Sequence, residues 1–213
     1  MPHGLTPLLT ARPGLERMIV HCELDLGMRR CEVERLKVSD FQSGRPRQIF
    51  IHGKGRNGGK YRSISWHPQT EHILNEFLEF RGREIEKARE KDPMVKIPGD
   101  LLLYERGGKL QAYKKTAIDN ILEDISARVG FKFSNHDLRR TCGRMMYRGG
   151  VKIEEIARIF GHSDTRTTMR YLGLDMEDMS SAMGRLAAYQ ASTYFPKTET
   201  NILSQEKSGQ SGI

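Results

Sequence analysis

Four residues in the last third of the chain carry the side chains needed for chemistry on a phosphate: His136, Arg139, His162 and Tyr171. An arginine guanidinium can clamp phosphate oxygens through paired, charge-assisted hydrogen bonds. Histidines can donate to the same group or move protons. A tyrosine hydroxyl becomes a nucleophile when a base or a cationic pocket helps it lose its proton. The four residues therefore predict a phosphate-processing site, provided that the fold brings them together.

The first two of these residues are expected on one face of a helix. Ser134 or Asn135 can cap the start of that helix. His136 and Arg139 stand three positions apart, so their side chains share a face. The glycine pair at 149–150 is a typical signal for a helix end. This pattern predicts that the helix presents a histidine and an arginine side by side.

Two more short helices are expected to bring the other two residues back to the first helix. Apolar residues at core spacing predict a helix over Ile153–Phe160, which Gly161 ends. His162 then falls in a turn. Asp164 can cap a third helix that carries Tyr171.

Three sequence pieces occur here in a fixed order. They are H-D-L-R-R-T at 136–141, F-G-H-S at 160–163, and Tyr171 nine positions after His162. Each piece alone is weak, but together they make the chain similar to the tyrosine recombinase (phage integrase) family. The resemblance covers roughly residues 15–194 and implies the C-terminal catalytic domain of such an enzyme.

The resemblance extends to G-M-R-R-C-E at 27–32, where the family has a Gly-hydrophobic-Arg-x-x-Glu signature. It places the first catalytic arginine of the family on Arg29. The catalytic lysine of the family lies in a Gly-Lys-Gly hairpin and maps to Lys54, with Lys60 as the alternative because glycine-rich loops can shift register. One position departs from the family, which usually has histidine where this chain has Arg140. We expect Arg140 to touch phosphate or to pack.

The family resemblance implies a mechanism. Arg29 and Arg139 would clamp the non-bridging oxygens of a DNA phosphodiester, with the two histidines as further donors or proton carriers. Tyr171 would attack phosphorus, and Lys54 would protonate the leaving 5′ oxygen. The resulting 3′-phosphotyrosyl bond preserves the energy of the phosphodiester, so rejoining would need no ATP, metal or cofactor. The sequence has no P-loop, D-x-D cluster or zinc-ligand spacing.

The charge of the chain favours a polyanionic partner. Its formal net charge is +8 and its pI is about 9.5. Basic residues gather in a predicted β-hairpin over Arg47–Trp66, whose other interpretation is a solvated edge hairpin protected by its charges. The predicted DNA contacts are Arg47, Arg56, Lys60, Arg62, Arg140 and Arg166.

The pattern as a whole predicts a mainly α fold with a small antiparallel β-sheet (α+β). Apolar spacing predicts helices over 15–26, 68–90, 116–129 and 174–194, and a short helix is expected to run from the turn at Gly27 to about Leu36. The expected domains are an N-terminal arm at 1–13, a catalytic domain at 14–195 and a flexible tail at 196–213. The N-terminal core-binding domain of the family is expected to be absent.

The remaining features bear on compartment and assembly. The three cysteines, Cys22, Cys31 and Cys142, show no C-x-x-C spacing and are interpreted as reduced thiols. With no apolar run of membrane-spanning length and no signal peptide core, the expected compartment is the cytoplasm. The resemblance implies double-stranded DNA as partner and a homotetramer on it. An apolar stripe in 174–194 would pack on its own domain or dock on a neighbouring protomer.

Two other functions remain open at this point. A type IB topoisomerase shares the chemistry, but the integrase-like motifs and the short spacing from His162 to Tyr171 disfavour it. A non-enzymatic helix-turn-helix module could use Ile153–Tyr171 for DNA binding. In that case Tyr171 would contact phosphate only.

Overall fold

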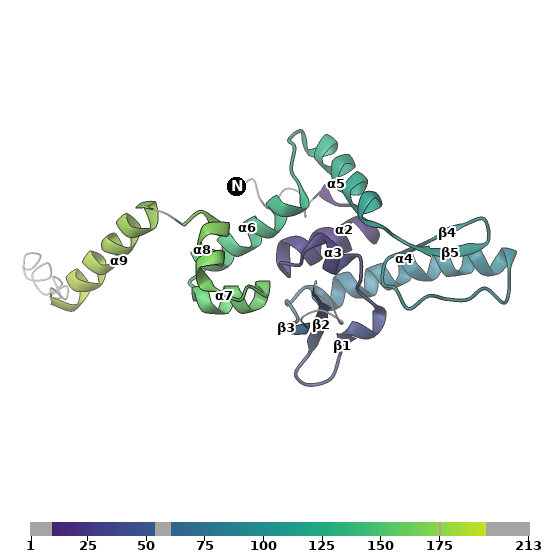
Figure 1. The fold of residues 1–213 in the computed structure, drawn as a ribbon, viewed down its shortest axis with the longest axis horizontal. Coiled ribbons are helices and arrows are strands. Elements are labelled where there is room, and N and C mark those ends of the chain that lie inside the picture. Colours follow the sequence, from purple (N-terminus) through teal and green to yellow (C-terminus); the bar gives the residue numbers. More distant parts are fainter. Residues whose placement is uncertain (1–9, 54–60, 175, 195–213) are drawn as a thin grey trace, which may run out of the picture. The chain divides into compact units, whose positions relative to one another are not determined.

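The computed structural model describes residues 10–53, 61–174 and 176–194 of the 213 (Figure 1). Its contacts divide the chain into two compact units, Met1–Leu172 and Gly173–Ile213. The predicted active-site residues that the structure describes all belong to the first unit. The second unit contains helix α9, Met176–Tyr194. None of the helices in the described ranges combines the length and the apolar character of a membrane span.

The first unit begins with a helix that changes from α-helical to π-helical winding in its second half. Helix α2 (Leu15–Val20) continues into a π-helical turn, η2 (His21–Asp25), which confirms the helix predicted over 15–26 but not its regular winding. Helix α3 is confined to Arg30–Val33, so the helix predicted to reach Leu36 is shorter than expected. Its start is set by Arg29, whose backbone is extended and whose N–H donates to the Glu32 carboxylate.

A three-stranded antiparallel sheet follows, in the order β1-β2-β3. Its strands are β1 (Phe41–Gln42), β2 (Gln48–His52) and β3 (Tyr61–Ser65). The register pairs Ile49 with Ile64, both buried, while Phe50 points outward. The predicted hairpin is therefore confirmed in its two strands, and residues 54–60 between them lie outside the residues that the structure describes. Strand β1 was not predicted, because two residues are too few to show a period.

The next elements form a scaffold around the apolar core. They are α4 (Thr70–Lys91), the hairpin of β4 (Leu103–Arg106) and β5 (Lys109–Ala112), and α5 (Lys115–Val129). Both long helices confirm the predicted ranges within a few residues, and Ile73, Phe77 and Ile125 lie fully or almost fully buried. The fold class is as predicted, mainly α with small antiparallel sheets (Figure 1).

Three helices end the first unit: α6 (Asn135–Arg148), α7 (Ile153–Phe160) and α8 (Thr165–Leu172). The cap of α6 is Ser134, whose hydroxyl accepts a hydrogen bond from the N–H of Asp137. Helix α7 ends at Gly161, which adopts a left-handed conformation with φ 61°. These turns fold α7 and α8 back onto α6, as the sequence predicts.

Close packing among α6, α7 and α8 makes Gly143 a sensitive position. A Cβ atom there would lie 2.5 Å from Leu172 Cδ2 and 2.9 Å from Phe160 Cζ. We expect Gly143→Ala to lower the free energy of unfolding by about 1–3 kcal/mol, because overpacking outweighs the gain in helix propensity. Urea unfolding measures this. Gly82→Ala, in the interior of α4 with nothing described within 4 Å, should instead stabilise by about 0.5–1 kcal/mol. Equal effects at the two sites would contradict the packing argument.

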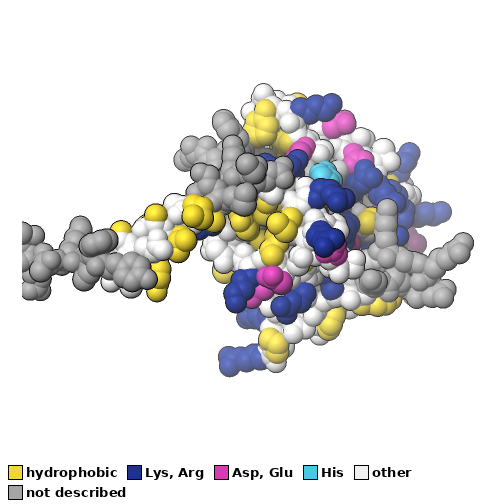
Figure 2. Space-filling model, turned by 60° about the vertical axis from the view of Figure 1, so that its left-hand side comes forward, with side chains coloured by type: hydrophobic (Ala, Val, Ile, Leu, Met, Phe, Trp, Pro, Cys, Tyr) yellow, Lys and Arg dark blue, Asp and Glu magenta, His cyan; other side chains and the backbone are white. Residues whose placement is uncertain are grey.

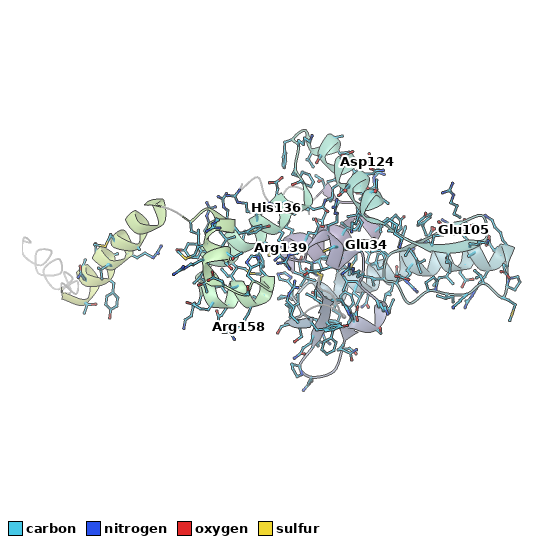
Figure 3. The ribbon with its side chains drawn as sticks, in the orientation of Figure 1. Glu34, Glu105, Asp124, His136, Arg139 and Arg158 are labelled. Atoms are coloured by element: carbon cyan, nitrogen blue, oxygen red, sulfur yellow. The ribbon has the colours of Figure 1, made fainter. Side chains whose placement is uncertain are left out.

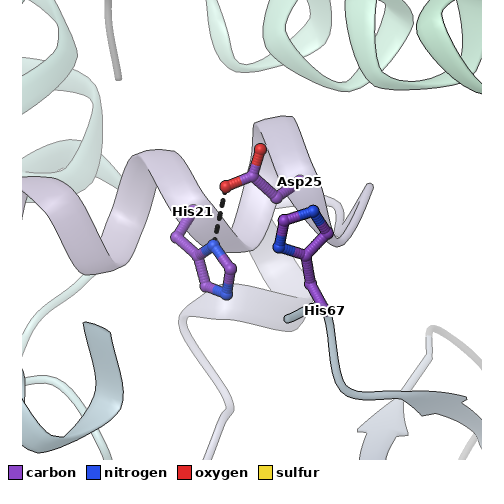
Figure 4. Close-up of side chains that lie close together, drawn as sticks. All are labelled: His21, Asp25 and His67. Carbon is purple, nitrogen blue, oxygen red and sulfur yellow. Dashed lines mark hydrogen bonds and ion pairs between the residues drawn. The ribbon is translucent and has the colours of Figure 1, made fainter. Parts of the chain in front are cut away.

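A buried histidine joins η2 to the start of α4 (Figure 4). One imidazole nitrogen each of His21 and His67 and one carboxylate oxygen of Asp25 lie within 4.8 Å of one another. His21 Nδ1 is 2.7 Å from Asp25 Oδ2, and its Nε2 is 3.0 Å from Thr70 Oγ1. Both ring nitrogens are thus used within the fold, and we interpret the cluster as a structural link.

Candidate active site

Three helices bring Tyr171 together with both predicted histidines. The phenol ring of Tyr171, on α8, has its centroid 4.7 Å from that of His136, in the first turn of α6. It lies 5.7 Å from the ring of His162, which follows the end of α7. The Tyr171 hydroxyl donates a hydrogen bond of 3.2 Å to the backbone carbonyl of His136. Residues that are 35 positions apart in sequence therefore share one site.

Arg139 forms the buried floor of this site. It projects from α6, the helix that also carries His136 (Figure 3), and its relative exposure is 3%. Its guanidinium lies 4.1 Å above the ring of Phe160 and donates to the backbone carbonyls of Gly27 and Phe160, the latter at 2.7 Å. One side chain thus ties the turn before α3 to the end of α7, which explains how distant motifs meet.

His162 is held as a neutral imidazole. Its Nε2 lies 3.5 Å from an Arg139 nitrogen, and its Nδ1 lies 2.9 Å from the hydroxyl of Thr168. Arginine only donates, so Nε2 accepts and the Nδ1 hydrogen points to Thr168. Burial, followed by the positive charges of Arg139 and Arg29, lowers the pKa of His162 to about 4. The sequence did not predict a role for Thr168. The one feature that could have indicated it is that Thr168 is a polar residue on the buried face of α8.

A single buried carboxylate organises the arginines. The Glu32 side chain is fully buried and accepts from the backbone N–H and the guanidinium of Arg29, at 2.7 and 2.9 Å. It also accepts two hydrogen bonds from Arg62, and Arg139 lies 3.8 Å away. Burial works to raise the pKa of Glu32, but Arg62 and the Arg29 N–H outweigh it and hold that pKa below its usual value. Glu32 is therefore ionised, and its carboxylate holds Arg29 and Arg62 by hydrogen bonds next to Arg139.

The predicted nucleophile is protonated in the free protein. Burial raises the pKa of Tyr171 above its ordinary value of 10. The positive charges of Arg139, Arg29 and Arg140 work in the opposite direction without cancelling that effect. Tyr171 would therefore need a proton acceptor at the moment it reacts.

The predicted DNA contacts have different outcomes. Arg47 is paired with Glu71 at 2.7 Å and stacks on Trp66, and Arg166 is exposed at the start of α8. Arg140 is half-buried, with its Nε inside the protein. The guanidinium of Arg62 is bound to Glu32, and its contact with DNA stays a prediction. Lys54, Arg56 and Lys60 lie outside the described residues.

Arg29 lines two pockets. The first is lined by Arg29, Arg30, Cys31, Lys115, Ser134, Asn135, His136 and Arg139. The second is lined by Arg29, Gly53, Tyr61, Arg62, Arg158, Gly161, His162 and Ser163. Both are rich in cations, and Figure 2 shows lysine and arginine side chains gathered around a histidine on one face of the molecule. Arg30, Lys115 and Arg158 were not predicted, since only tertiary folding brings them to the site.

The neutral state of His162 is testable by titration. In the folded protein we expect the NMR resonance of its imidazole to titrate near pH 4, against about 6.5 in the same chain unfolded in urea. As the pH falls, His162 in the unfolded chain is therefore protonated at a higher pH than His162 in the folded protein. The stability that His162 contributes is therefore full above about pH 6.5 and is lost as the pH falls toward about 4. A folded-state midpoint at or above about 6.5 would refute the described environment.

Known proteins share sequence with most of this chain. The model of the phage integrase family matches residues 12–178. A protein named tyrosine recombinase XerC from Bifidobacterium longum is 28% identical over 180 residues, which are 83% of this chain and 48% of that protein. The XerC of Halalkalibacterium halodurans is 30% identical over 125 residues, 58% of this chain and 38% of its own length.

Solved structures show the same fold. The crystal structure of XerA recombinase has a TM-score of 0.60 at 21% identity, covering 85% of this chain and 58% of that one. The XerH recombinase in a post-cleavage complex with its difH substrate has a TM-score of 0.58 at 24% identity, covering 78% and 44%. The chain spans about half the length of the curated relatives it matches.

Proposed function

The chain belongs to the phage integrase family, and on that premise we propose that it is the catalytic part of a site-specific DNA recombinase. It would cut and rejoin strands through a covalent phosphotyrosine. The observation that carries this proposal is the position of the Tyr171 hydroxyl, beside two histidines and within a site whose floor is Arg139. The relatives named tyrosine recombinases support it.

We propose that the scissile phosphate binds between Arg29 and Arg139. Arg29 lines both pockets and its side chain is 36% exposed, so it can turn toward a phosphate. Arg139 lines the first of these pockets. Two guanidiniums on the non-bridging oxygens would stabilise the extra negative charge that develops as phosphorus is attacked. His136 would add a donor from the exposed side of α6.

The strand cleavage step then exchanges one oxygen on phosphorus for another. The Tyr171 oxygen forms a bond to phosphorus, and the bond from phosphorus to the 5′ oxygen breaks. The phenolic proton must leave, and His136, whose ring lies against the phenol, is the described group best placed to take it. We propose that Lys54 supplies the proton to the departing 5′ oxygen. Rejoining reverses these transfers and requires no cofactor.

The wider assembly is also a proposal. We propose double-stranded DNA as the partner and a homotetramer as the active form, in the cytoplasm. The matched span of 12–178 supports a catalytic domain at 14–195. On α9, Met183 and Leu186 are exposed, which supports a role for this helix in docking on a second copy. The XerH recombinase, solved in complex with its difH substrate, supports the choice of partner.

Covalent trapping tests the function. The protein is incubated with nicked duplexes from a pool of source-genome sequences, so that cleavage releases a short fragment and cannot reverse. A protein–DNA adduct on a denaturing gel, mapped by peptide mass spectrometry to Tyr171, is the expected result. Binding without any adduct would instead favour the helix-turn-helix module. Relaxation of supercoiled plasmid without strand exchange would favour the topoisomerase.

A further inference from the structure

Arg62 is an arginine that the proposed mechanism does not use, yet it is held by three hydrogen bonds. It lies on β3, and its side chain is 12% exposed. Its two terminal nitrogens donate to the two oxygens of Glu32 at 2.6 and 2.9 Å. Its Nε donates to the backbone carbonyl of Ile159 at 2.8 Å. This fork geometry fixes the guanidinium completely.

The partners of Arg62 lead directly to two residues of the proposed active site. Glu32 holds Arg29 through the same carboxylate. Ile159 lies in the last turn of α7, three residues before His162, and a Cβ atom at Gly161 would stand 3.2 Å from Arg62 Cδ. Arg62 lies on β3, which is the second strand of the β2–β3 hairpin. Arg62 is thus the point where the sheet, α3 and the end of α7 meet.

We propose that Arg62 is a positioning residue, which holds Arg29 and His162 in their places and keeps Glu32 from competing with the phosphate for the catalytic arginines. The inference rests on the proposed function. Without Arg62, the Glu32 carboxylate would lose two hydrogen bonds while remaining buried. The nearest cations left to it are Arg29 at 2.9 Å and Arg139 at 3.8 Å. It would then draw toward itself the groups that the phosphate needs.

Lysine cannot replace Arg62 in this role. An ammonium group keeps the charge but is a compact donor without the planar fork, so it cannot bind both carboxylate oxygens and the Ile159 carbonyl in one fixed plane. Arg62→Lys therefore keeps the positive charge and removes the fixed hydrogen bonds, so its effect reports on positioning alone. Arg81→Lys is a matched control, because Arg81 also joins two segments, by donating to the carbonyls of Pro98 and Asp100 at 2.7 and 3.2 Å.

The first measurement is the single-turnover cleavage rate on the nicked duplex, at saturating protein and at a temperature where urea curves show every variant folded. We expect Arg62→Lys to slow cleavage by about 100-fold, the cost typical of a misplaced reacting group. DNA affinity should change by less than about threefold, since lysine keeps the positive charge at this position, and Arg81→Lys should cleave like the parent. Arg62→Lys cleaving within about threefold of the parent would overturn the proposal.

A second measurement does not require activity. In the free protein, Arg62→Lys keeps a positive charge near His162 but loses the fixed hydrogen bond that ties β3 to the Ile159 carbonyl at the end of α7. The NMR midpoint of the His162 imidazole should rise in Arg62→Lys, because burial is the main cause of its low pKa, and stay unchanged in Arg81→Lys. An unchanged midpoint in Arg62→Lys would also overturn the proposal. If the parent forms no adduct, the proposed function fails, and the titration still decides the role of Arg62.

Discussion

Replacement of Tyr171 by phenylalanine is expected to abolish the covalent protein–DNA adduct, lowering the cleavage rate by at least about four orders of magnitude. Phenylalanine keeps the ring that packs against His136 and His162 and removes only the oxygen that would attack phosphorus. The folded state loses one hydrogen bond, from the hydroxyl to the His136 carbonyl. That costs about 0.5–1.5 kcal/mol, so the variant should fold and bind DNA.

The matched control is Tyr147→Phe. Tyr147 lies on α6 and is half-buried, like Tyr171, but no proposed step uses it. The nicked-duplex assay should give parent-like adduct with Tyr147→Phe and none with Tyr171→Phe. An adduct that persists in Tyr171→Phe would move the nucleophile to another tyrosine. Loss of DNA binding in that variant would mean that the hydroxyl positions substrate rather than attacks it.

The helices around this tyrosine were predictable because local chemistry sets their limits. Ser134 caps α6, Gly161 ends α7 in a left-handed conformation, and apolar residues recur at helical spacing between such signals. The two strands of the hairpin were predictable for the same reason, since alternation places Ile49 and Ile64 on one face. Signals within a few residues of one another are sufficient for elements of this kind.

The organisation of the charges was not predictable. From sequence, Arg62 is one more basic residue in a basic hairpin, and its burial depends on Glu32, which is 30 positions away. The same applies to Thr168, whose contact with His162 requires that α8 fold back on α7. Spacing along the chain shows which residues share a face of one helix. It does not show which ion pairs close between elements, and the choice between Lys54 and Lys60 stays open.

Arg139 carries the second large effect, because it serves the fold and the proposed chemistry together. The guanidinium donates to the carbonyls of Gly27 and Phe160, and it lies over the Phe160 ring. Burial, followed by the charge of Arg29, lowers its pKa to about 10, so it stays charged at neutral pH. A lysine there can satisfy one carbonyl but not both.

Arg139→Lys is therefore expected to slow cleavage by about 1,000-fold, the upper range for loss of one donor to a developing negative charge, and to lower the free energy of unfolding by about 2 kcal/mol. Arg140→Lys, one position along α6, should change cleavage by less than about tenfold. Single-turnover cleavage and urea unfolding measure the two effects separately. If Arg139→Lys were destabilised but cleaved at the parent rate, Arg139 would be a structural arginine alone. The phosphate clamp would then have to come from Arg29 with a different partner, of which Arg140 is the nearest along the helix.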